Sequence, residues 1–274
     1  MKVSSIHIYP IKSLGGISLP HVNLTLQGLE HDRRFMLTNK AGMCLTQRDN
    51  TAMALLKTKI EGKQLVVWNS QAPTHRIAFP LKPNHFSKQQ LVEIWEDTCV
   101  ANVLHKGINK WFSRQLKQNC QLVYMPEDAH RAIDKKYRKE GEIVSFADAY
   151  PMLLLGDASL DDLNARLKNP VPADRFRANI FFSGGAPFEE DKWATFSINT
   201  QQFRGVKLCN RCQVPNINQQ TGKMEKEPNR TLATFRKIGK NIKMGHNVCW
   251  EKKLSKGKAR IAVGDRLKSV DGGR

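Results

Sequence analysis

The chain has 274 residues, of which 40% are hydrophobic and 25% charged, so it can bury a sizeable core and is not an intrinsically disordered protein. Its longest apolar run, residues 150–155, is far shorter than the roughly 18 residues that a membrane-spanning helix needs, so no contact with a membrane is expected. The 44 Lys and Arg residues outnumber the 25 Asp and Glu residues, and the resulting net charge of +19 favours anionic partners.

Short apolar segments separated by turn residues predict mostly strands in the first half of the chain. Residues 39–42 contain Asn and Gly, which favour a tight turn, so the segments on either side are expected to form a hairpin. Helical spacing of apolar residues predicts a helix that ends at Leu116. In chain order, the expected elements are a strand at 6–9, a loop at 10–16, a strand at 17–19, a hairpin of 34–37 and 43–46, strands at 65–68 and 91–95, and a helix at 108–116.

The second half opens with a polar stretch, residues 128–142, which has no apolar periodicity and predicts a loop. The apolar run at 150–155 predicts a buried strand or the start of a helix. A helix is expected next, with Asp157 or Ser159 as its N-cap and apolar residues continuing to Leu167. Further strands are expected at 179–183, 203–208 and 259–263, and residues 264–267 turn into a last strand.

Many short strands and few helices indicate a mainly β, or α+β, fold of barrel type with helical additions. The polar, basic stretch at 118–145 is a plausible domain boundary. We therefore expect an N-terminal β-barrel domain over residues 1–120 and a second β-barrel domain with a few helices over residues 121–274.

The six cysteines lack the dense, regular spacing of a disulfide framework, and the first residues alternate like a strand rather than forming a signal peptide. We therefore expect free thiols and a cytoplasmic protein. Only Cys209 and Cys212 are close in sequence, and one such pair is half of a zinc or iron–sulfur site.

Cys212 follows Arg211, and an adjacent guanidinium favours the thiolate form, which is a nucleophile and a soft-metal ligand. The alternative is an inert, buried cysteine pair. Cysteine hydrolase chemistry would need a base such as His246, but no local signature marks that residue.

Basic side chains recur at the ends of expected strands. Lys12 and Ser13 lie in a loop with glycines, and Arg33, Arg48 and Arg177 lie beside strand ends. Guanidinium groups and backbone N–H groups match phosphate oxygens, so these loops are expected to converge on a phosphate-bearing ligand. The chain contains no Walker motif and no dinucleotide-binding fingerprint.

Asp148 lies between apolar residues. A carboxylate in such a place is a desolvated acid–base group, a hydrogen-bond acceptor that orients a neighbour, or a simple cap of a turn.

The segments that carry these residues, in order and over essentially the whole chain, resemble those of proteins with a MOSC domain, named after the C-terminal domain of molybdenum cofactor sulfurase. Segments 9–13, 28–36 and 45–48 resemble the N-terminal β-barrel domain that precedes MOSC domains, and 146–151, 158–164, 175–180 and 209–212 resemble the MOSC domain itself. In these segments the chain resembles bacterial relatives of the mitochondrial amidoxime-reducing component.

The resemblance implies a molybdopterin-type molybdenum cofactor. Cys212, the second cysteine of the C-x-R-C motif, is then the ligand to molybdenum, and Asp148 is the acid near the metal. The residues implied to contact the pterin and its phosphate are Lys12, Ser13, Arg33, Thr46, Arg48, Arg177, Asn179, Asn210 and Arg211. The chain departs from the family pattern at residues 214–218 and at His246, which bears on substrate preference.

The resemblance also implies an enzyme that reduces small N-hydroxylated compounds by two electrons. With no flavin or nicotinamide fingerprint and no room for a four-cysteine cluster, the chain is expected to take electrons from a separate, acidic redox protein, either ferredoxin-like or a flavoprotein. Residues 222–274, with fifteen Lys and Arg against five Asp and Glu, are the expected docking face, and residues 135–139 contribute to it.

Two alternatives stay open. One is a sulfur carrier in which Cys212 bears a persulfide. The other is a basic nucleic-acid-binding module, which is disfavoured because Phe235 and Trp250 are the only aromatic residues for stacking in the basic segment.

Overall fold

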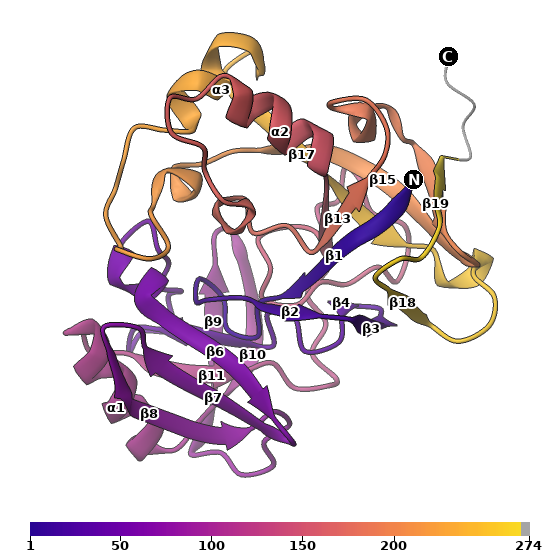
Figure 1. Ribbon diagram of the computed structural model, residues 1–274. Helices are drawn as coiled ribbons and strands as arrows, with labels where there is room; N and C mark the ends of the chain where they lie inside the picture. The colour runs from indigo at the N-terminus through magenta and orange to yellow at the C-terminus, as the bar shows by residue number, and fades with distance from the viewer. Residues whose placement is uncertain (270–274) are drawn as a thin grey trace.

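Short strands make up most of the molecule, as the sequence predicts (Figure 1). The structure is a computed structural model that describes residues 1–269. The strands of its first half are β1 (Lys2–Ile8), β2 (Ile17–Leu19), β3 (His21–Thr25), β4 (Gly28–Leu29), β5 (Phe35–Thr38), β6 (Leu56–Glu61), β7 (Gln64–Asn69), β8 (Ala72–Pro80), β9 (Lys88–Ile94), β10 (Asp97–Val103) and β11 (Gln121–Tyr124). The first α-helix, α1 (Lys106–Leu116), confirms the predicted helix.

The second half adds two helices and the remaining strands. The helices are α2 (Asp157–Ala165) and α3 (Asn229–Phe235). The strands are β12 (Met152–Gly156), β13 (Ile180–Ser183), β14 (Thr195–Ile198), β15 (Gln201–Asn210), β16 (Lys237–Ile238), β17 (Asn241–Trp250), β18 (Arg260–Ala262) and β19 (Leu267–Ser269). The predicted strands at 179–183, 203–208 and 259–263 are therefore confirmed, and the run at 150–155 is a strand.

The largest sheet has the strand order β19-β14-β15-β17-β12-β13-β1-β2. All pairs along it are antiparallel except β12 and β13, which are parallel and are joined by α2. Figure 1 shows β1, the first strand of the chain, beside β13 in the upper half of the molecule. The amino-terminal strand is therefore a member of a sheet built mainly from the second half of the sequence.

The rest of the first half forms smaller sheets. One has the order β5-β11-β10-β9, and another consists of β6, β7 and β8. The predicted turn at residues 39–42 is present, with Gly42 at a φ of 92°. Its second arm is shorter than predicted, because Cys44 makes only an isolated bridge to Thr38 and residues 43–46 form no strand.

The amino terminus of α2 differs from the prediction. The N-cap is Gly156, so no side chain caps the first turn. The helix ends at Ala165 rather than Leu167. The Ser159 hydroxyl instead donates to the Glu190 carboxylate at 2.9 Å and accepts from the Phe188 N–H at 2.7 Å. A buried carboxylate needs hydrogen-bond donors, and the Ser159 hydroxyl is a donor to Glu190 rather than a cap of α2.

Two large apolar clusters give the molecule its core. One contains Ile6, Phe182 and Phe203 of the large sheet, and the other contains Phe35 and Phe112 of the first half. Within residues 1–269, no helix is long and apolar enough to cross a membrane. The cytoplasmic location stays a prediction.

Candidate functional site

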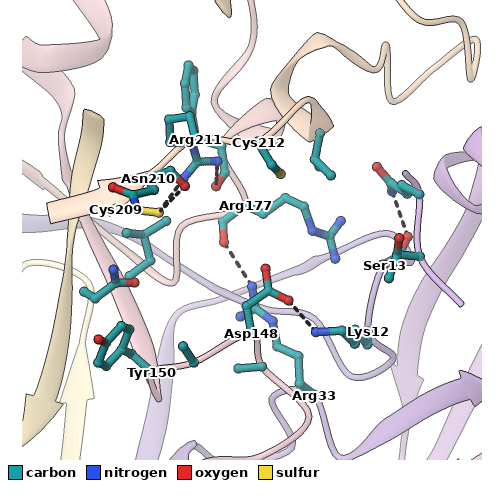
Figure 2. A pocket seen from close by; sticks show the side chains of 18 of the residues that line it. Lys12, Ser13, Arg33, Asp148, Tyr150, Arg177, Cys209, Asn210, Arg211 and Cys212 are labelled. Atoms are coloured by element: carbon teal, nitrogen blue, oxygen red, sulfur yellow. Dashed lines mark hydrogen bonds and ion pairs between the residues drawn. The ribbon is translucent and has the colours of Figure 1, made fainter. Parts of the chain in front are cut away.

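One pocket lies where loops from both halves of the sequence meet (Figure 2). From the first half come the loops after β1 and after β4, the 46–48 loop and the turn between β9 and β10. From the second half come the 146–150 loop, the loop before β13 and the loop after β15. All of the residues predicted from the sequence to form the site line this pocket: Lys12, Ser13, Arg33, Thr46, Arg48, Asp148, Arg177, Asn179, Asn210, Arg211 and Cys212. Their separate roles stay predictions.

Tyr9 organises the arginine side of the pocket. The guanidinium carbon of Arg33 lies 4.4 Å from the centroid of the Tyr9 ring, and that of Arg177 lies 4.3 Å from it. A Cβ atom at Gly16 would lie 2.6 Å from the Tyr9 ring, so this position must be glycine for the ring to lie here. The loop glycine thus makes room for the aromatic ring that holds both arginines.

Arg33 is fixed by a dense set of acceptors. Its Nη1 donates to both carboxylate oxygens of Asp32, at 2.9 and 2.7 Å, and to the Asn179 side-chain oxygen at 3.1 Å. Its Nη2 donates to the Arg177 carbonyl oxygen at 3.2 Å. The Asn179 amide nitrogen donates to the His7 carbonyl oxygen at 3.1 Å, so Asn179 ties Arg33 to β1.

The Arg177 guanidinium has a buried hydrogen-bond donor that no described residue accepts. Its Nη2 atom is buried and finds no hydrogen-bond partner within residues 1–269. Burial lowers the pKa of Arg177 to about 10, with the attraction of Tyr9 opposing this shift and the repulsion of Arg33 adding to it. The backbone of Arg177 has a φ of 55°, in the left-handed region that non-glycine residues rarely adopt. Such strain persists where the surroundings fix it and is common at functional sites.

Lys12 and Asp148 form an ion pair at the edge of the pocket. The Lys12 ammonium donates to Asp148 at 2.5 Å and to the Phe146 carbonyl oxygen at 2.9 Å. Burial lowers the pKa of Lys12, and the Asp148 charge opposes that shift. Desolvation works to raise the pKa of Asp148, but Lys12, Arg48 and Arg33 outweigh it and hold that pKa well below its usual range.

Among the roles that the sequence left open for Asp148, its cationic neighbours favour that of a charged hydrogen-bond acceptor. Its side chain is 61% exposed, which lets water stabilise the charged carboxylate and screen its partners. At neutral pH it carries no proton and is an acceptor, which is one of the three roles that the sequence left open.

The 46–48 loop closes another side of the pocket. The Thr46 hydroxyl donates to Asp49 at 2.9 Å and accepts from the Arg48 N–H at 3.1 Å, which shapes the turn that carries the Arg48 side chain. The Gln47 amide donates to the Ser13 carbonyl oxygen at 2.7 Å and so joins this turn to the first loop. Ser13 also has a left-handed backbone, with a φ of 68°.

The two cysteines of the C-x-R-C motif lie in different surroundings. Arg211 donates to the Cys209 sulfur at 3.1 Å and to the Phe176 carbonyl oxygen at 2.9 Å. The loop after β15 thus turns the Arg211 side chain back toward Cys209, so the guanidinium adjacent to Cys212 in sequence bonds to the other thiol (Figure 2). The Cys212 carbonyl oxygen accepts from the Asn229 side chain at 2.7 Å, which anchors the half-buried Cys212 to α3.

The sequence also raised a zinc or iron–sulfur site and a Cys–His pair for these cysteines. In the part of the chain that the structure describes, no group of three or more His, Cys, Asp or Glu side chains is arranged to hold a metal ion. His246 does not line the pocket, and its Nδ1 lies 2.7 Å from the Glu190 carbonyl oxygen. It is a buried structural residue rather than a base for Cys212.

Trp95 is a pocket residue that sequence reasoning missed. It lies in the two-residue turn between β9 and β10 and has a left-handed backbone, with a φ of 57°. The Arg48 guanidinium carbon lies 4.0 Å from the centroid of its ring. The available signal was a Trp-Glu turn between two apolar runs, where Gly, Asn or Asp is the usual choice.

Comparisons with known proteins match a family profile to each half of the chain. The family profile "MOSC N-terminal beta barrel domain" matches residues 1–119, and the profile "MOSC domain" matches residues 141–268. The chain is 31% identical over 244 residues to mitochondrial amidoxime-reducing component 1 of Mus musculus, covering 85% of this chain and 71% of that protein. It is 30% identical over 250 residues to the Homo sapiens protein of the same name, covering 85% and 72%.

Molybdenum cofactor sulfurases are also similar to the chain. The sulfurase of Oryza sativa subsp. japonica is 31% identical over 265 residues, a match that covers 89% of this chain and 32% of the sulfurase. The chain thus spans about a third of the length of these sulfurases. The matches over both halves of the sequence show that the chain belongs to the MOSC family, with a MOSC N-terminal β-barrel domain followed by a MOSC domain.

Proposed function

We propose that the protein is a molybdenum-cofactor-dependent reductase of N-hydroxylated compounds, with Cys212 as the protein ligand to molybdenum. The observation that carries this proposal is the presence, in one pocket, of the Cys212 thiol and of a buried Arg177 nitrogen without a protein partner. The relatives named amidoxime-reducing component favour this reaction class.

The pocket residues fit a phosphate-bearing pterin. Five cationic side chains line it, from Lys12, Arg33, Arg48, Arg177 and Arg211, against the single carboxylate of Asp148. A cationic pocket with a buried, unused guanidinium donor attracts an anion, and guanidinium groups match the geometry of phosphate oxygens. Arg177 would therefore hold the phosphate of the cofactor, with Arg33 held beside it by Tyr9.

The chemistry of the thiols favours Cys212 over Cys209 as the metal ligand. A thiolate is a soft ligand that suits molybdenum. The Cys209 sulfur already accepts a hydrogen bond from Arg211, whereas that guanidinium does not contact Cys212. Asn229 also anchors the backbone of Cys212, which holds the segment that carries the thiol at the pocket.

In the proposed reaction, an N-hydroxylated substrate takes up two electrons and two protons. The N–O bond breaks, the nitrogen gains a proton and the oxygen leaves as water. A molybdenum centre held by Cys212 would supply the two electrons and the oxygen-acceptor chemistry, which belong mainly to the cofactor. The chain's contribution is to bind the cofactor, to orient the substrate and to arrange charge around it.

Asp148 and Lys12 would orient the substrate at the pocket edge. The ionised Asp148 carboxylate accepts hydrogen bonds and has exposed surface, so it can accept from an N–H or O–H group of the substrate. The buried Lys12 ammonium fixes this carboxylate from the protein side. Asp148 is therefore a substrate-positioning acceptor in this account and does not deliver a proton from its own carboxyl.

A separate, acidic redox protein would supply the electrons, since surface charge of opposite sign increases the rate of encounter. The basic residues of 222–269 form the proposed docking face, and residues 270–274 lie outside the described part of the chain. Lys139 is less free than the sequence suggests, because its ammonium pairs with Glu251 at 2.8 Å.

A sulfur carrier is the second candidate, favoured by the 31% identity to a molybdenum cofactor sulfurase. In that function Cys212 would carry a persulfide and transfer its outer sulfur to an acceptor. Both candidates require the Cys212 thiol, so loss of function in a Cys212 variant alone does not separate them. Reduction of an N-hydroxylated compound does.

The test is reduction of benzamidoxime to benzamidine by the purified protein with a reduced viologen as electron source. We expect Cys212→Ala to abolish turnover and Cys209→Ala to retain much of it, because Arg211 keeps its bond to the Phe176 carbonyl. Equal turnover of the wild type and Cys212→Ala would refute the assignment. No turnover of any protein, together with cyanide-releasable sulfur on Cys212, would favour the sulfur carrier.

A further inference from the structure

Trp95 supplies aromatic surface at the open side of the pocket. Three aromatic residues line the pocket within the described chain: Trp95 is 38% exposed, whereas Tyr150 is 8% and Phe176 1% exposed. A ligand that enters from solvent therefore meets its main aromatic surface at Trp95.

The backbone places Trp95 there at a cost. Its φ of 57° lies in the left-handed region, which disfavours bulky side chains and which Gly, Asn or Asp adopts more readily. The pairing of Ile94 with Asp97 leaves Trp95 and Glu96 as a two-residue turn, so the side chain projects from the end of the β9–β10 hairpin. A strained and partly exposed tryptophan gains little from burial, which points to a role in contacts made by the ring.

The contacts of the ring fix it against the polar wall of the pocket. The Arg48 guanidinium carbon lies 4.0 Å from the ring centroid, and the Lys12 ammonium lies 5.7 Å from it. The indole N–H donates to Asp148 at 3.3 Å. Trp95 thus stands beside Asp148, the acceptor that the proposed function assigns to the substrate.

We propose that Trp95 is a specificity-determining residue, whose indole favours ligands that carry the N-hydroxyl group on a flat, conjugated group over compact aliphatic ones. The inference rests on the proposed function for the class of substrate. A flat group can stack on or pack edge-on against the indole, while the polar end of the ligand reaches Asp148. A compact aliphatic ligand can reach Asp148 but leaves the indole surface in water.

The test compares the binding of benzamidoxime and acetamidoxime, which share the polar group and differ in the flat ring. Calorimetry on the oxidised protein without a reductant measures binding with no turnover. We expect the wild type to bind benzamidoxime more tightly, Trp95→Phe to keep most of that preference, and Trp95→Leu to reduce it roughly three- to tenfold. Leu91→Ala is the matched control, since Leu91 is an exposed residue of β9 outside the pocket, and it should leave the preference unchanged.

A merely structural Trp95 would behave differently. If the ring served only to hold Arg48 and Asp148, Trp95→Leu would weaken both ligands by the same factor, and this outcome would overturn the proposal. It would also be overturned if the wild type bound both amidoximes equally or bound neither.

The same preference should then appear in kcat/KM when a reductant is added. If Trp95→Leu removes the binding preference but neither the wild type nor any variant reduces either compound, the proposed reaction fails while the role of Trp95 stands. If both compounds are reduced and Trp95→Leu keeps the preference, the role of Trp95 fails while the reaction stands.

Discussion

Arg131 holds together two segments that border the pocket, and its removal should destabilise the protein. The Arg131 side chain is 2% exposed and donates to the carbonyl oxygens of Ser145, Ala147 and Asp148 at 2.9, 2.5 and 2.6 Å. It also pairs with Asp97 at 2.8 Å, at the start of β10. One guanidinium thus joins the 145–148 segment that carries Asp148 to the hairpin that carries Trp95.

The magnitude follows from the groups that Arg131→Met would leave without a donor. Methionine keeps most of the aliphatic part of the side chain, so the loss considered is that of the hydrogen bonds made by the guanidinium. Ser145 and Ala147 are buried, at 0% and 6% exposure, whereas Asp148 and Asp97 have access to water. Each buried acceptor without a partner costs about 1–3 kcal/mol, so the free energy of unfolding should fall by about 2–6 kcal/mol.

Urea unfolding of the wild type and of Arg131→Met measures this loss, and hydrogen exchange locates it. We expect faster exchange at Val144, whose N–H donates to the Arg131 carbonyl oxygen, and along the following segment. Arg138→Met is the matched control in the same loop, because Arg138 is exposed, and it should change stability by less than about 0.5 kcal/mol. A loss below about 1 kcal/mol for Arg131→Met, or a loss equal to that of the control, would refute the reasoning.

Three further outcomes are expected. Arg177→Ala should yield folded protein that is depleted of pterin, since a phosphate left without a desolvated charged partner weakens binding by about 2–5 kcal/mol; pterin released from purified protein measures this, and full occupancy would contradict it. Burial lowers the pKa of His246, so the folded state binds its proton more weakly than the unfolded state, whose pKa is 6.5. The contribution of the neutral His246 to the free energy of unfolding should therefore be complete above pH 6.5 and decrease as the pH falls below it. The urea midpoint should then fall less in His246→Gln than in the wild type, and an equal fall in both proteins would show that His246 is not involved. Turnover with an acidic protein donor should fall as salt rises, because the Debye length is about 8 Å at physiological ionic strength, while turnover with a reduced viologen should change far less; the same salt dependence with both donors would remove the basis for electrostatic docking.

Local patterns in the sequence predicted the elements with the strongest signals. The helix that became α1 and the strands β7 and β13 have clear apolar periodicity or short apolar runs. Strand β17 was missed because Gly245 and polar residues interrupt its apolar pattern, although it lies between β15 and β12 in the large sheet. Pairing with neighbours on both sides, which depends on the whole fold, decides the conformation of such a segment.

The membership of the site was predictable from the resemblance, but the contacts within it were not. The motifs indicated that Arg33, Arg177 and Cys212 belong together, and they line one pocket. That Arg211 contacts Cys209 depends on the path of the loop after β15, which no spacing rule specifies. The exposure of Asp148 likewise depends on the rim of the pocket rather than on its apolar sequence neighbours.

The contacts of Trp95 could not be predicted from the sequence either. Its distance from Asp148 along the chain is 53 residues, and only the packing of the β9–β10 hairpin against the 145–148 segment brings the two together. Residues whose roles depend on long-range packing and on unusual backbone conformations are those that a single sequence does not reveal.

The central claim is that this pocket holds a molybdenum–pterin cofactor through Cys212. Elemental analysis for molybdenum, together with fluorescence of released pterin, tests it directly on protein made in a molybdenum-replete host. The account predicts stoichiometric molybdenum and pterin in the wild type, and molybdenum lost or labile in Cys212→Ser with its fold intact. Wild-type protein that contains neither molybdenum nor pterin would contradict it.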